Sequence, residues 1–197
     1  MTHLDRRANI EAAALAAATI LIYLFIYTPL KQRSSLNTLV GAVAGALPPL
    51  IGWVSAAGGP SSKGFRWELL AAPEAVFLFT LLFLWQMPHF LAINWMFRAE
   101  YVRAGFVMWS NDDESGARTS ALSLFFSALL VPLMSVPAWT GFARAWFAVA
   151  GLLLTGMLLW LAWEFYGKRS RLAARKLFFA TLLFLPAVLL LLLIAAQ

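Results

Sequence analysis

The residues best suited to chemistry lie in one polar stretch between two apolar runs. Carboxylates clustered with cations suit an anionic substrate bridged by Mg²⁺, because this hard metal takes oxygen ligands and a phosphate supplies others. We expect Glu100, Asp112 and Asp113 to be metal ligands. A merely solvated loop would carry the same charges, so the charges alone leave both interpretations open. The stretch 98–118 carries, among its polar residues, Arg98, Glu100, Tyr101, Arg103, Asn111, Asp112, Asp113, Glu114 and Arg118.

Two further features combine apolar residues with helix breakers. The stretch Tyr27–Leu30 ends in the cations Lys31 and Arg33, and the next apolar stretch contains Pro48 and Pro49. Two missing N–H donors free backbone carbonyls that protein or a water-filled cavity must satisfy. We expect the helix to unwind at these prolines and to line a cavity; a simple kink is the alternative.

A second proline-containing run, Trp85–Phe90, carries His89 three residues after Gln86. This spacing predicts that the two polar side chains share roughly one helical face. Ionisable groups inside a membrane are costly and tend to be functional. His89 could ligate haem iron, polarise a substrate or only hydrogen-bond another helix. Trp53 and Trp85 flank the proline-broken segments, where an aromatic wall could hold a lipid tail or a macrocycle.

The elements that position these residues are predicted to be membrane helices. Hydrophobic residues make up 62% of the 197-residue chain, charged residues 12%, and the mean hydropathy is +0.78. Six apolar stretches reach the roughly 20 residues that cross about 30 Å of hydrocarbon as helix. We expect an all-α fold with one membrane domain over residues 1–197, and a first span that is not cleaved as a signal peptide. The predicted spans are 12–30, 36–57, 75–97, 119–136, 145–163 and 177–196.

The charges predict the orientation of these helices. The net charge is +6, but Lys and Arg fall between the apolar stretches, so we expect a bilayer and no nucleic acid as partner. Alternate loops divide the 15 cations unequally, and the positive-inside rule places the richer face in the cytoplasm, with both termini outside. That face would carry the polar loops 31–35, 98–118 and 167–176. The poorer face would carry Arg6, Arg7, Lys63, Arg66 and Arg144. The chain contains no cysteine, so any metal must be held by oxygen or histidine.

The residues above fall into two longer motifs. The first runs from Tyr27 to Trp53 with Leu36–Val43 in its middle, and the second joins Trp85–Phe90 to Tyr101–Phe106. Both motifs resemble the protohaem IX farnesyltransferases, also called haem O synthases, a branch of the UbiA superfamily of intramembrane prenyltransferases. The resemblance covers nearly the whole chain and is strongest from Tyr27 to Met108.

The resemblance implies an all-helical bacterial inner-membrane enzyme whose central cavity opens to the cytoplasm. It implies transfer of a farnesyl group from farnesyl diphosphate to the vinyl group of haem b, giving haem O, with Mg²⁺ assisting departure of diphosphate. Lys31 and Arg33 match the family's basic pair, and Glu100, Tyr101 and Arg103 fall in its second polar motif, here taken as catalytic. The residues expected to bind substrate are Lys31, Arg33, Gln86, His89, Arg98, Trp53 and Trp85.

The chain also departs from the family pattern. Members usually have nine membrane helices and a first Asn/Asp-rich motif, and this chain is expected to start after that motif. Glu100 stands where the family commonly has Asp, and Trp109–Glu114 replaces a more apolar stretch. The chain could accordingly be a fragment, a wrongly started reading frame, one part of a split enzyme or a degenerate paralogue. A partner, either a second copy or a chain that carries the missing helices, could complete it. The alternatives are a haem- or lipid-binding subunit without activity, and, with less support, a transporter or channel.

Overall fold

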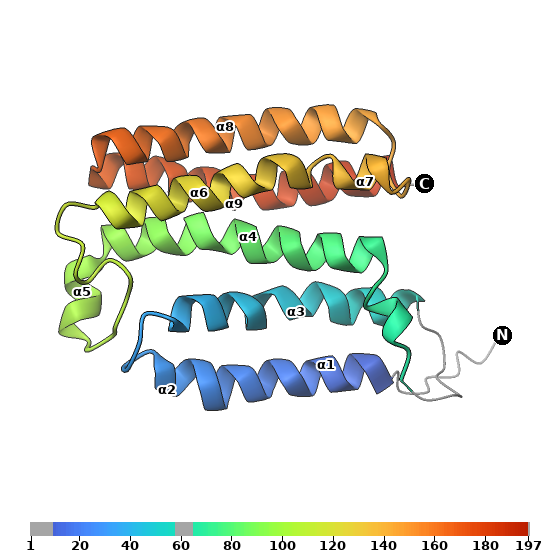
Figure 1. Ribbon diagram of the computed structural model, residues 1–197, viewed down its shortest axis with the longest axis horizontal. Helices are drawn as coiled ribbons and strands as arrows, with labels where there is room; N and C mark the ends of the chain where they lie inside the picture. The colour runs from blue at the N-terminus through green and yellow to red at the C-terminus, as the bar shows by residue number, and fades with distance from the viewer. Residues whose placement is uncertain (1–9, 58–64, 197) are drawn as a thin grey trace.

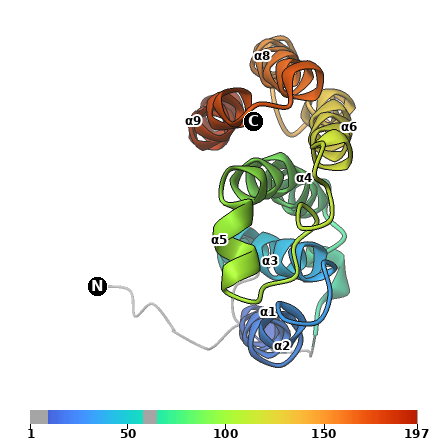
Figure 2. The same cartoon turned by 90° about the vertical axis from the view of Figure 1, so that its left-hand side faces the viewer.

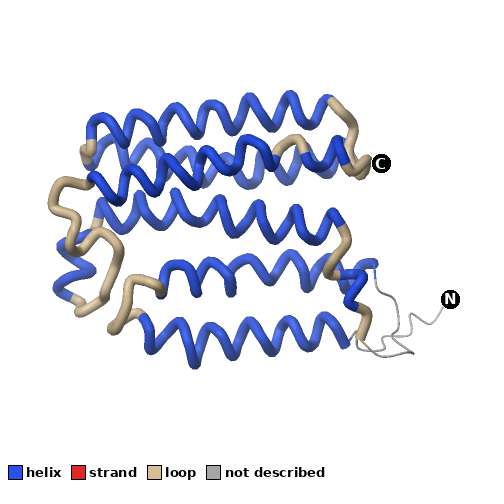
Figure 3. Tube along the Cα trace, viewed as in Figure 1, coloured by secondary structure: helices blue, strands red, loops and turns tan. Residues whose placement is uncertain are grey.

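The computed structural model describes residues 10–57 and 65–196, and in these ranges the chain is helical with no β-sheet (Figures 1 and 3). Six helical segments are long and apolar enough to cross a membrane, which confirms the predicted all-α fold. Short helices lie at their ends. The elements are α1 (Ile10–Leu21), η1 (Ile22–Tyr27), α2 (Thr28–Leu30), α3 (Asn37–Ala57), η2 (Trp67–Leu69), α4 (Pro73–Met96), α5 (Arg98–Arg103), α6 (Ala117–Leu133), α7 (Val136–Trp139), α8 (Trp146–Lys168) and α9 (Arg171–Ala195).

The helices form two regions that share α4. Helices α4, α6, α8 and α9 pack around a common core that includes Phe77, Phe147 and Phe165. Helix α3 packs on the other side of α4, and the α1–η1–α2 span packs on α3 (Figure 2). The four-helix cluster is therefore extended by a row of two spans. We call these regions the four-helix cluster and the α1–α3 layer.

Small residues let the α1–α3 layer approach its neighbours closely. A Cβ atom at Gly41 would lie 2.8 Å from the Tyr27 ring, and one at Gly45 would overlap Oε1 of Gln86. Small residues spaced by four are a common means of close helix packing in membranes. The π-helical turn η1 precedes Pro29, which lacks a backbone donor, and it presents Tyr27 to Gly41.

The expected unwinding at Pro48 and Pro49 is wrong. Helix α3 continues through both prolines to Ala57. Proline removes a donor and clashes with the preceding turn, but packed membrane helices tolerate it when neighbours restore the contacts. The cavity described below is lined by earlier residues of α3 and not by the proline turn.

The polar turns predicted to share one face do lie at the same end of the molecule, the left-hand end of Figure 1. The predicted loop 167–176 is nevertheless too long, because α9 begins at Arg171. Ser170 caps this helix by accepting a hydrogen bond from the backbone N–H of Ala173 at 3.2 Å. The cations after Ser170 therefore stand on a helix instead of a loop. Arg6, Arg7 and Lys63 lie outside the described residues.

Candidate functional site

The two sequence motifs meet through hydrogen bonds at the polar end. The backbone N–H of Val107 donates to the carbonyl of Lys31 at 2.8 Å. Asn37 Nδ2 donates to the carbonyls of Val107 at 2.6 Å and Ser34 at 2.7 Å. Asn37 is buried at the start of α3, so one side chain fixes both the turn after α2 and the segment after α5. These bonds join the α1–α3 layer to the four-helix cluster.

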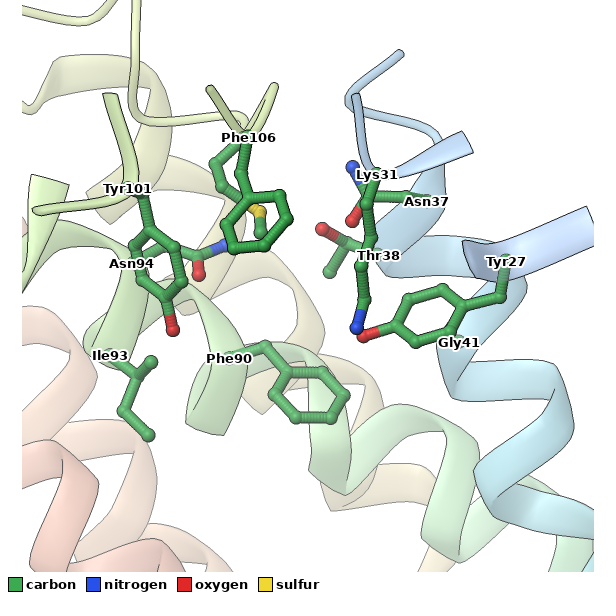
Figure 4. A pocket seen from close by; sticks show the side chains of 11 residues that line it. Tyr27, Lys31, Asn37, Thr38, Gly41, Phe90, Ile93, Asn94, Tyr101 and Phe106 are labelled. Atoms are coloured by element: carbon green, nitrogen blue, oxygen red, sulfur yellow. The ribbon is translucent and has the colours of Figure 1, made fainter. Parts of the chain in front are cut away.

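A cavity of about 200 Å³ lies beneath these bonds, between the α1–α3 layer on one side and α4, α5 and the following loop on the other (Figure 4). This volume is below the roughly 300–1,000 Å³ of typical small-molecule pockets, so it suits a charged group instead of a whole lipid-sized substrate. The cavity is lined by Tyr27, Lys31, Asn37, Thr38, Gly41, Phe90, Ile93, Asn94, Tyr101, Phe106 and Met108.

Lys31 is the cation of this cavity. Its side chain extends into the space beside Tyr27 in Figure 4, with Nζ 4.4 Å from the centre of the Tyr27 ring and 6.0 Å from that of Phe106. In the part of the chain that the structure describes, no carboxylate lies within ion-pairing distance of Lys31. An ammonium group held by aromatic faces and not neutralised by a carboxylate is available to an anion.

Two buried polar side chains complete the wall. Asn94 is 4% exposed and Thr38 is 5% exposed, and both line the cavity. Neither the Asn94 amide nor the Thr38 hydroxyl hydrogen-bonds a described residue. A buried polar group without a protein partner is costly unless water or a ligand satisfies it. The sequence analysis did not select either residue, although a lone Asn near the end of an apolar run is itself a signal.

Tyr101 faces the cavity from α5, with its hydroxyl directed inward (Figure 4). Burial raises the pKa of this phenol above 10.0, and the neighbouring Tyr27 raises it further. Tyr101 is therefore protonated at neutral pH and can donate a hydrogen bond to an anion. Of the three residues predicted to be catalytic, only Tyr101 lines this cavity.

Glu100 and Arg103 point elsewhere. Glu100 lines a different, open pocket that faces the α8–α9 turn, with Arg98, Arg169 and Arg171 among its neighbours. Arg103 is exposed, and its Nη2 lies 3.9 Å from Oε1 of Glu100. The short helix α5 thus turns successive residues toward two sites, which the linear motif does not reveal.

The predicted metal ligands do not gather. Oδ2 of Asp113 accepts the backbone N–H of Thr119 at 2.7 Å and so caps the first turn of α6. Burial alone would raise the pKa of Asp113, but hydrogen bonds from Thr119 and Arg118 outweigh it and hold the pKa below 3.8. Asp112 is exposed. Among residues 10–57 and 65–196, no three carboxylate or imidazole groups are placed to hold one metal ion.

Gln86 and His89 form hydrogen bonds to different helices, so the predicted shared face is wrong. Gln86 Nε2 donates to the carbonyl of Ala42 on α3 at 3.3 Å and to that of Leu82 at 3.0 Å. His89 Nδ1 lies 2.9 Å from the hydroxyl of Thr181 on α9. Because α4 lies between these two helices, a 60° difference in direction is enough to separate the side chains.

The other predicted substrate contacts also lie outside the cavity. Trp85 Nε1 donates to the carbonyl of Thr181 at 2.7 Å, which ties α4 to α9. Trp53 lies near the opposite end of α3 and donates to the carbonyl of Leu69 at 3.0 Å. Arg33 is exposed, and Arg98 donates to the carbonyl of Asp113 at 2.8 Å.

The arrangement as a whole can bind an anion at the polar end of a membrane protein. Lys31 supplies positive charge, Tyr101 supplies an O–H donor and Asn94 supplies N–H donors. The Tyr27 and Phe106 rings exclude water from one side. The six apolar helices define the class: a helical integral membrane protein, here with a polar cavity at one end of its spans.

The comparison with known proteins narrows this class. A sequence profile of the UbiA prenyltransferase family matches residues 7–194, and the chain belongs to this family. It is 40% identical over 183 residues to the mitochondrial protoheme IX farnesyltransferase of Arabidopsis thaliana, covering 93% of this chain and 40% of the relative. It is 36% identical over 180 residues to protoheme IX farnesyltransferase of Solibacter usitatus, covering 91% and 58%.

A third relative, protoheme IX farnesyltransferase of Salinibacter ruber, is 38% identical over 173 residues, covering 87% of this chain and 57% of the relative. The chain thus spans about half the length of the curated relatives it matches. These relatives confirm the family resemblance found in the two motifs. No solved structure gives a significant match to the chain.

Proposed function

We propose that this chain takes part in transfer of a farnesyl group from farnesyl diphosphate to haem b, forming haem O. The relatives named above are protoheme IX farnesyltransferases, and the chain matches them over about nine tenths of its length. The observation that carries the proposal is the cavity at the polar end, where an unpaired Lys31 faces the protonated Tyr101 and the unpartnered amide of Asn94.

In this proposal the cavity binds the diphosphate, and the farnesyl chain extends into the membrane. Lys31 neutralises charge on the diphosphate oxygens, while Tyr101 and Asn94 donate hydrogen bonds to them. The C–O bond breaks and its electron pair leaves with the diphosphate. The vinyl π electrons of haem b form the new C–C bond, and the cation left on the haem takes up water and releases a proton. The Tyr27, Phe90 and Phe106 rings shield the allylic cation from early capture.

A divalent metal is general among UbiA prenyltransferases, and the expected ion is Mg²⁺. The described residues do not fit it, because Asp113 is committed to its capping bond and no cluster of carboxylates accompanies Glu100. The proposed steps on this chain therefore use its cation and its neutral donors. The metal would supply charge neutralisation on the diphosphate when bound.

The single-domain organisation over 1–197 and the orientation belong to the same proposal. We place the polar end at the cytoplasmic face of a bacterial inner membrane, since the turns at that end carry most of the described cations. The substrates and the bilayer are the proposed partners. A second copy, or a chain that supplies further helices, would cover the exposed face of α1, of whose span only 6% is buried.

The test begins with binding, because it does not depend on a complete enzyme. The purified chain is titrated with farnesyl diphosphate, and Lys31→Ala is expected to weaken binding about tenfold or more through loss of a charge-assisted contact. Lys168→Ala is the matched control, because that ammonium lies at the same end but pairs with Glu164 at 2.8 Å. Unchanged affinity of Lys31→Ala for farnesyl diphosphate would show that the diphosphate does not bind in this cavity.

The activity is then measured as haem O formation, by mass spectrometry, in membranes supplied with haem b, farnesyl diphosphate and Mg²⁺. Product that disappears in Lys31→Ala but not in Lys168→Ala supports the proposal. Haem binding without product, from folded protein, supports the second candidate, a haem- or lipid-binding subunit. The absence of a metal cluster among the described residues is the observation that favours this candidate.

A further inference from the structure

A second concave surface lies on α4 and α9 at the polar end of the molecule. This α4–α9 groove has a volume of about 520 Å³. It is formed where α4 ends and α9 begins, at the polar end of two helices long and apolar enough to cross a membrane. The groove is lined by Met96, Phe97, Arg171, Leu172, Arg175, Phe178 and Phe179.

The groove carries two cations without a described anionic partner. Arg171 and Arg175 are one helical turn apart, and their guanidinium groups lie over the rings of Phe97 at 5.7 Å and Phe179 at 5.6 Å. No described carboxylate pairs with either arginine. Two lysines of this region differ in this respect, because Lys168 and Lys176 both bond Glu164, at 2.8 and 3.0 Å. The groove therefore suits a ligand with two negative groups at one edge.

His89 is not among the residues that line the groove, but it packs against one that is. Phe178 lines the groove, and its ring centre lies 4.9 Å from that of the His89 imidazole. Met96 lies seven residues after His89, on the same face of α4 and about 10 Å nearer the surface. Trp85 stacks on the imidazole at 5.4 Å. Two aromatic rings thus pack beside the imidazole, so a ligand would reach it through a ring nitrogen.

The hydrogen bonds of Thr181 determine which imidazole nitrogen is available. The Thr181 hydroxyl has one proton, and it donates this proton to the carbonyl of Phe178 at 2.6 Å. It can then only accept from His89, so Nδ1 carries the proton of that 2.9 Å bond. A charged imidazolium here would be costly inside a membrane, so Nε2 keeps its lone pair. Nε2 has no hydrogen-bond partner among the described residues and is not fully buried.

We propose that the α4–α9 groove binds haem b edge-on, with its propionates on Arg171 and Arg175 and its iron ligated by Nε2 of His89. A metal-ligating histidine typically donates its other N–H to a fixed acceptor, which Thr181 provides. Phe178, which contacts His89, follows Arg175 by three residues and Arg171 by seven, so it lies about 5 and 10 Å along α9 from the two arginines. The apolar rings of Phe178 and Phe179 pack against the macrocycle.

The choice of haem as ligand rests on the proposed function, and the site is distinct from the cavity around Lys31. Helix α4 carries both sites, since Phe90 and Asn94 line the cavity while Met96 lines the groove. Figure 2 places α5 and α9 on the same side of α4, away from α6. The two substrates would therefore be held by one rigid helix, with the farnesyl chain and the haem edge on a common side.

The experiment titrates ferric haem b into the whole chain in nanodiscs of zwitterionic phosphatidylcholine, followed by absorbance and electron paramagnetic resonance. His89→Ala is expected to lose the histidine-ligated spectrum, and added imidazole should restore it, which shows that the variant is folded. Arg171→Gln with Arg175→Gln should weaken binding about tenfold and keep the ligated spectrum. The control, Lys168→Gln with Lys176→Gln, removes the same charge from the same end and should change neither quantity.

An unaltered spectrum in His89→Ala overturns the proposal, and so does unaltered affinity in the arginine variant. The rival occupant is an anionic phospholipid, whose phosphate would bind the same arginines. Nanodiscs with phosphatidylglycerol test it: if the arginine variant loses this lipid but keeps haem affinity, the groove is a lipid site. Haem ligation by His89 without haem O formation would leave this inference standing and remove the proposed activity. Haem O formation with an unchanged His89→Ala spectrum would support the proposed activity and overturn this inference.

Discussion

The four-helix cluster and the α1–α3 layer are built from similarly apolar helices but are held together differently. In the most apolar part of α4, 44% of the residues are buried, whereas the corresponding share in the α1–η1–α2 span is 6%. The cluster encloses large side chains such as Phe147 and Phe165, both 0% exposed. Among its described residues the layer has no fully buried aromatic ring, and its buried hydrophobic residues are alanine or aliphatic, such as Ala42 and Leu47.

The difference shows how much of the layer depends on specific contacts. Lipid is as apolar as leucine, so helices associate in a membrane through close packing and hydrogen bonds. The layer relies on Gly45 against Gln86, on Asn37 bonded to Val107, and on buried Glu11, whose Oε1 accepts the Nε of Arg66 at 2.9 Å. The cavity around Lys31 lies at the boundary between the regions, so a change at this boundary alters the candidate site while the cluster stays folded.

The largest expected effect breaks the cluster itself. Phe147→Ala removes a fully buried ring of α8 and should lower the free energy of unfolding by about 3 kcal/mol, because a cavity is left in the core. Leu153→Ala on the same helix is the control: this side chain is 72% exposed, and the change should cost about 0.5 kcal/mol or less. Thermal or denaturant unfolding in detergent micelles measures both. Equal losses would mean that the cluster has no distinct core.

Gly45→Leu separates the layer from the cluster. Its side chain would overlap Gln86, which is held by two hydrogen bonds, and overpacking of this kind costs about 2 kcal/mol. We expect weaker farnesyl diphosphate binding with little change in unfolding of the cluster. Gly52→Leu on the same helix is matched to it, since a Cβ there meets nothing within 4 Å. A Gly52→Leu protein as impaired as Gly45→Leu would contradict the boundary role of Gly45.

Asp113→Asn tests the capping role against the predicted metal role. Loss of the charged cap of α6 should cost about 1 kcal/mol at pH 7. The pKa of Asp113 is lowered in the folded state, so its stabilisation is present above pH 3.8 and is lost as the pH falls through the lowered value. The difference between variant and parent should therefore shrink in acid.

Asp112→Asn is the neighbouring control, because Asp112 is exposed and forms no bond that the structure describes. Unfolding curves from pH 3 to pH 7 compare the two variants. If Asp112→Asn weakened Mg²⁺-dependent binding of farnesyl diphosphate while Asp113→Asn left stability unchanged, the metal interpretation would be restored.

The smallest expected effect refines the boundary site. Tyr101→Phe removes one neutral hydrogen-bond donor and should weaken farnesyl diphosphate binding about fivefold, corresponding to about 1 kcal/mol. Because burial raises the pKa of Tyr101 above 10.0, its contribution should not titrate between pH 7 and that value. Tyr166 lies on α8, outside the cavity, so Tyr166→Phe should leave the affinity for farnesyl diphosphate unchanged. A greater loss in Tyr166→Phe would place the anion elsewhere.

Parts of the candidate site were predictable and parts were not. Lys31 and Tyr101 were identified because they fall in the two motifs that resemble the family. Asn94 and Thr38 were missed, since isolated polar residues at the ends of membrane helices are common and their spacing shows no partner. Asp113 was misinterpreted because a capping carboxylate and a metal ligand look the same in a sequence.

The sequence by itself determined the six spans, the common end of the polar turns and the family, because apolar runs of membrane length and two local motifs are sufficient for these. Only the tertiary structure decided which polar residues meet. A side chain's direction depends on helix phase and on its neighbours, so Glu100 and Tyr101 separate while Lys31 and Asn94, 63 positions apart, line one cavity. The same packing turns Gln86 toward α3 and His89 toward α9.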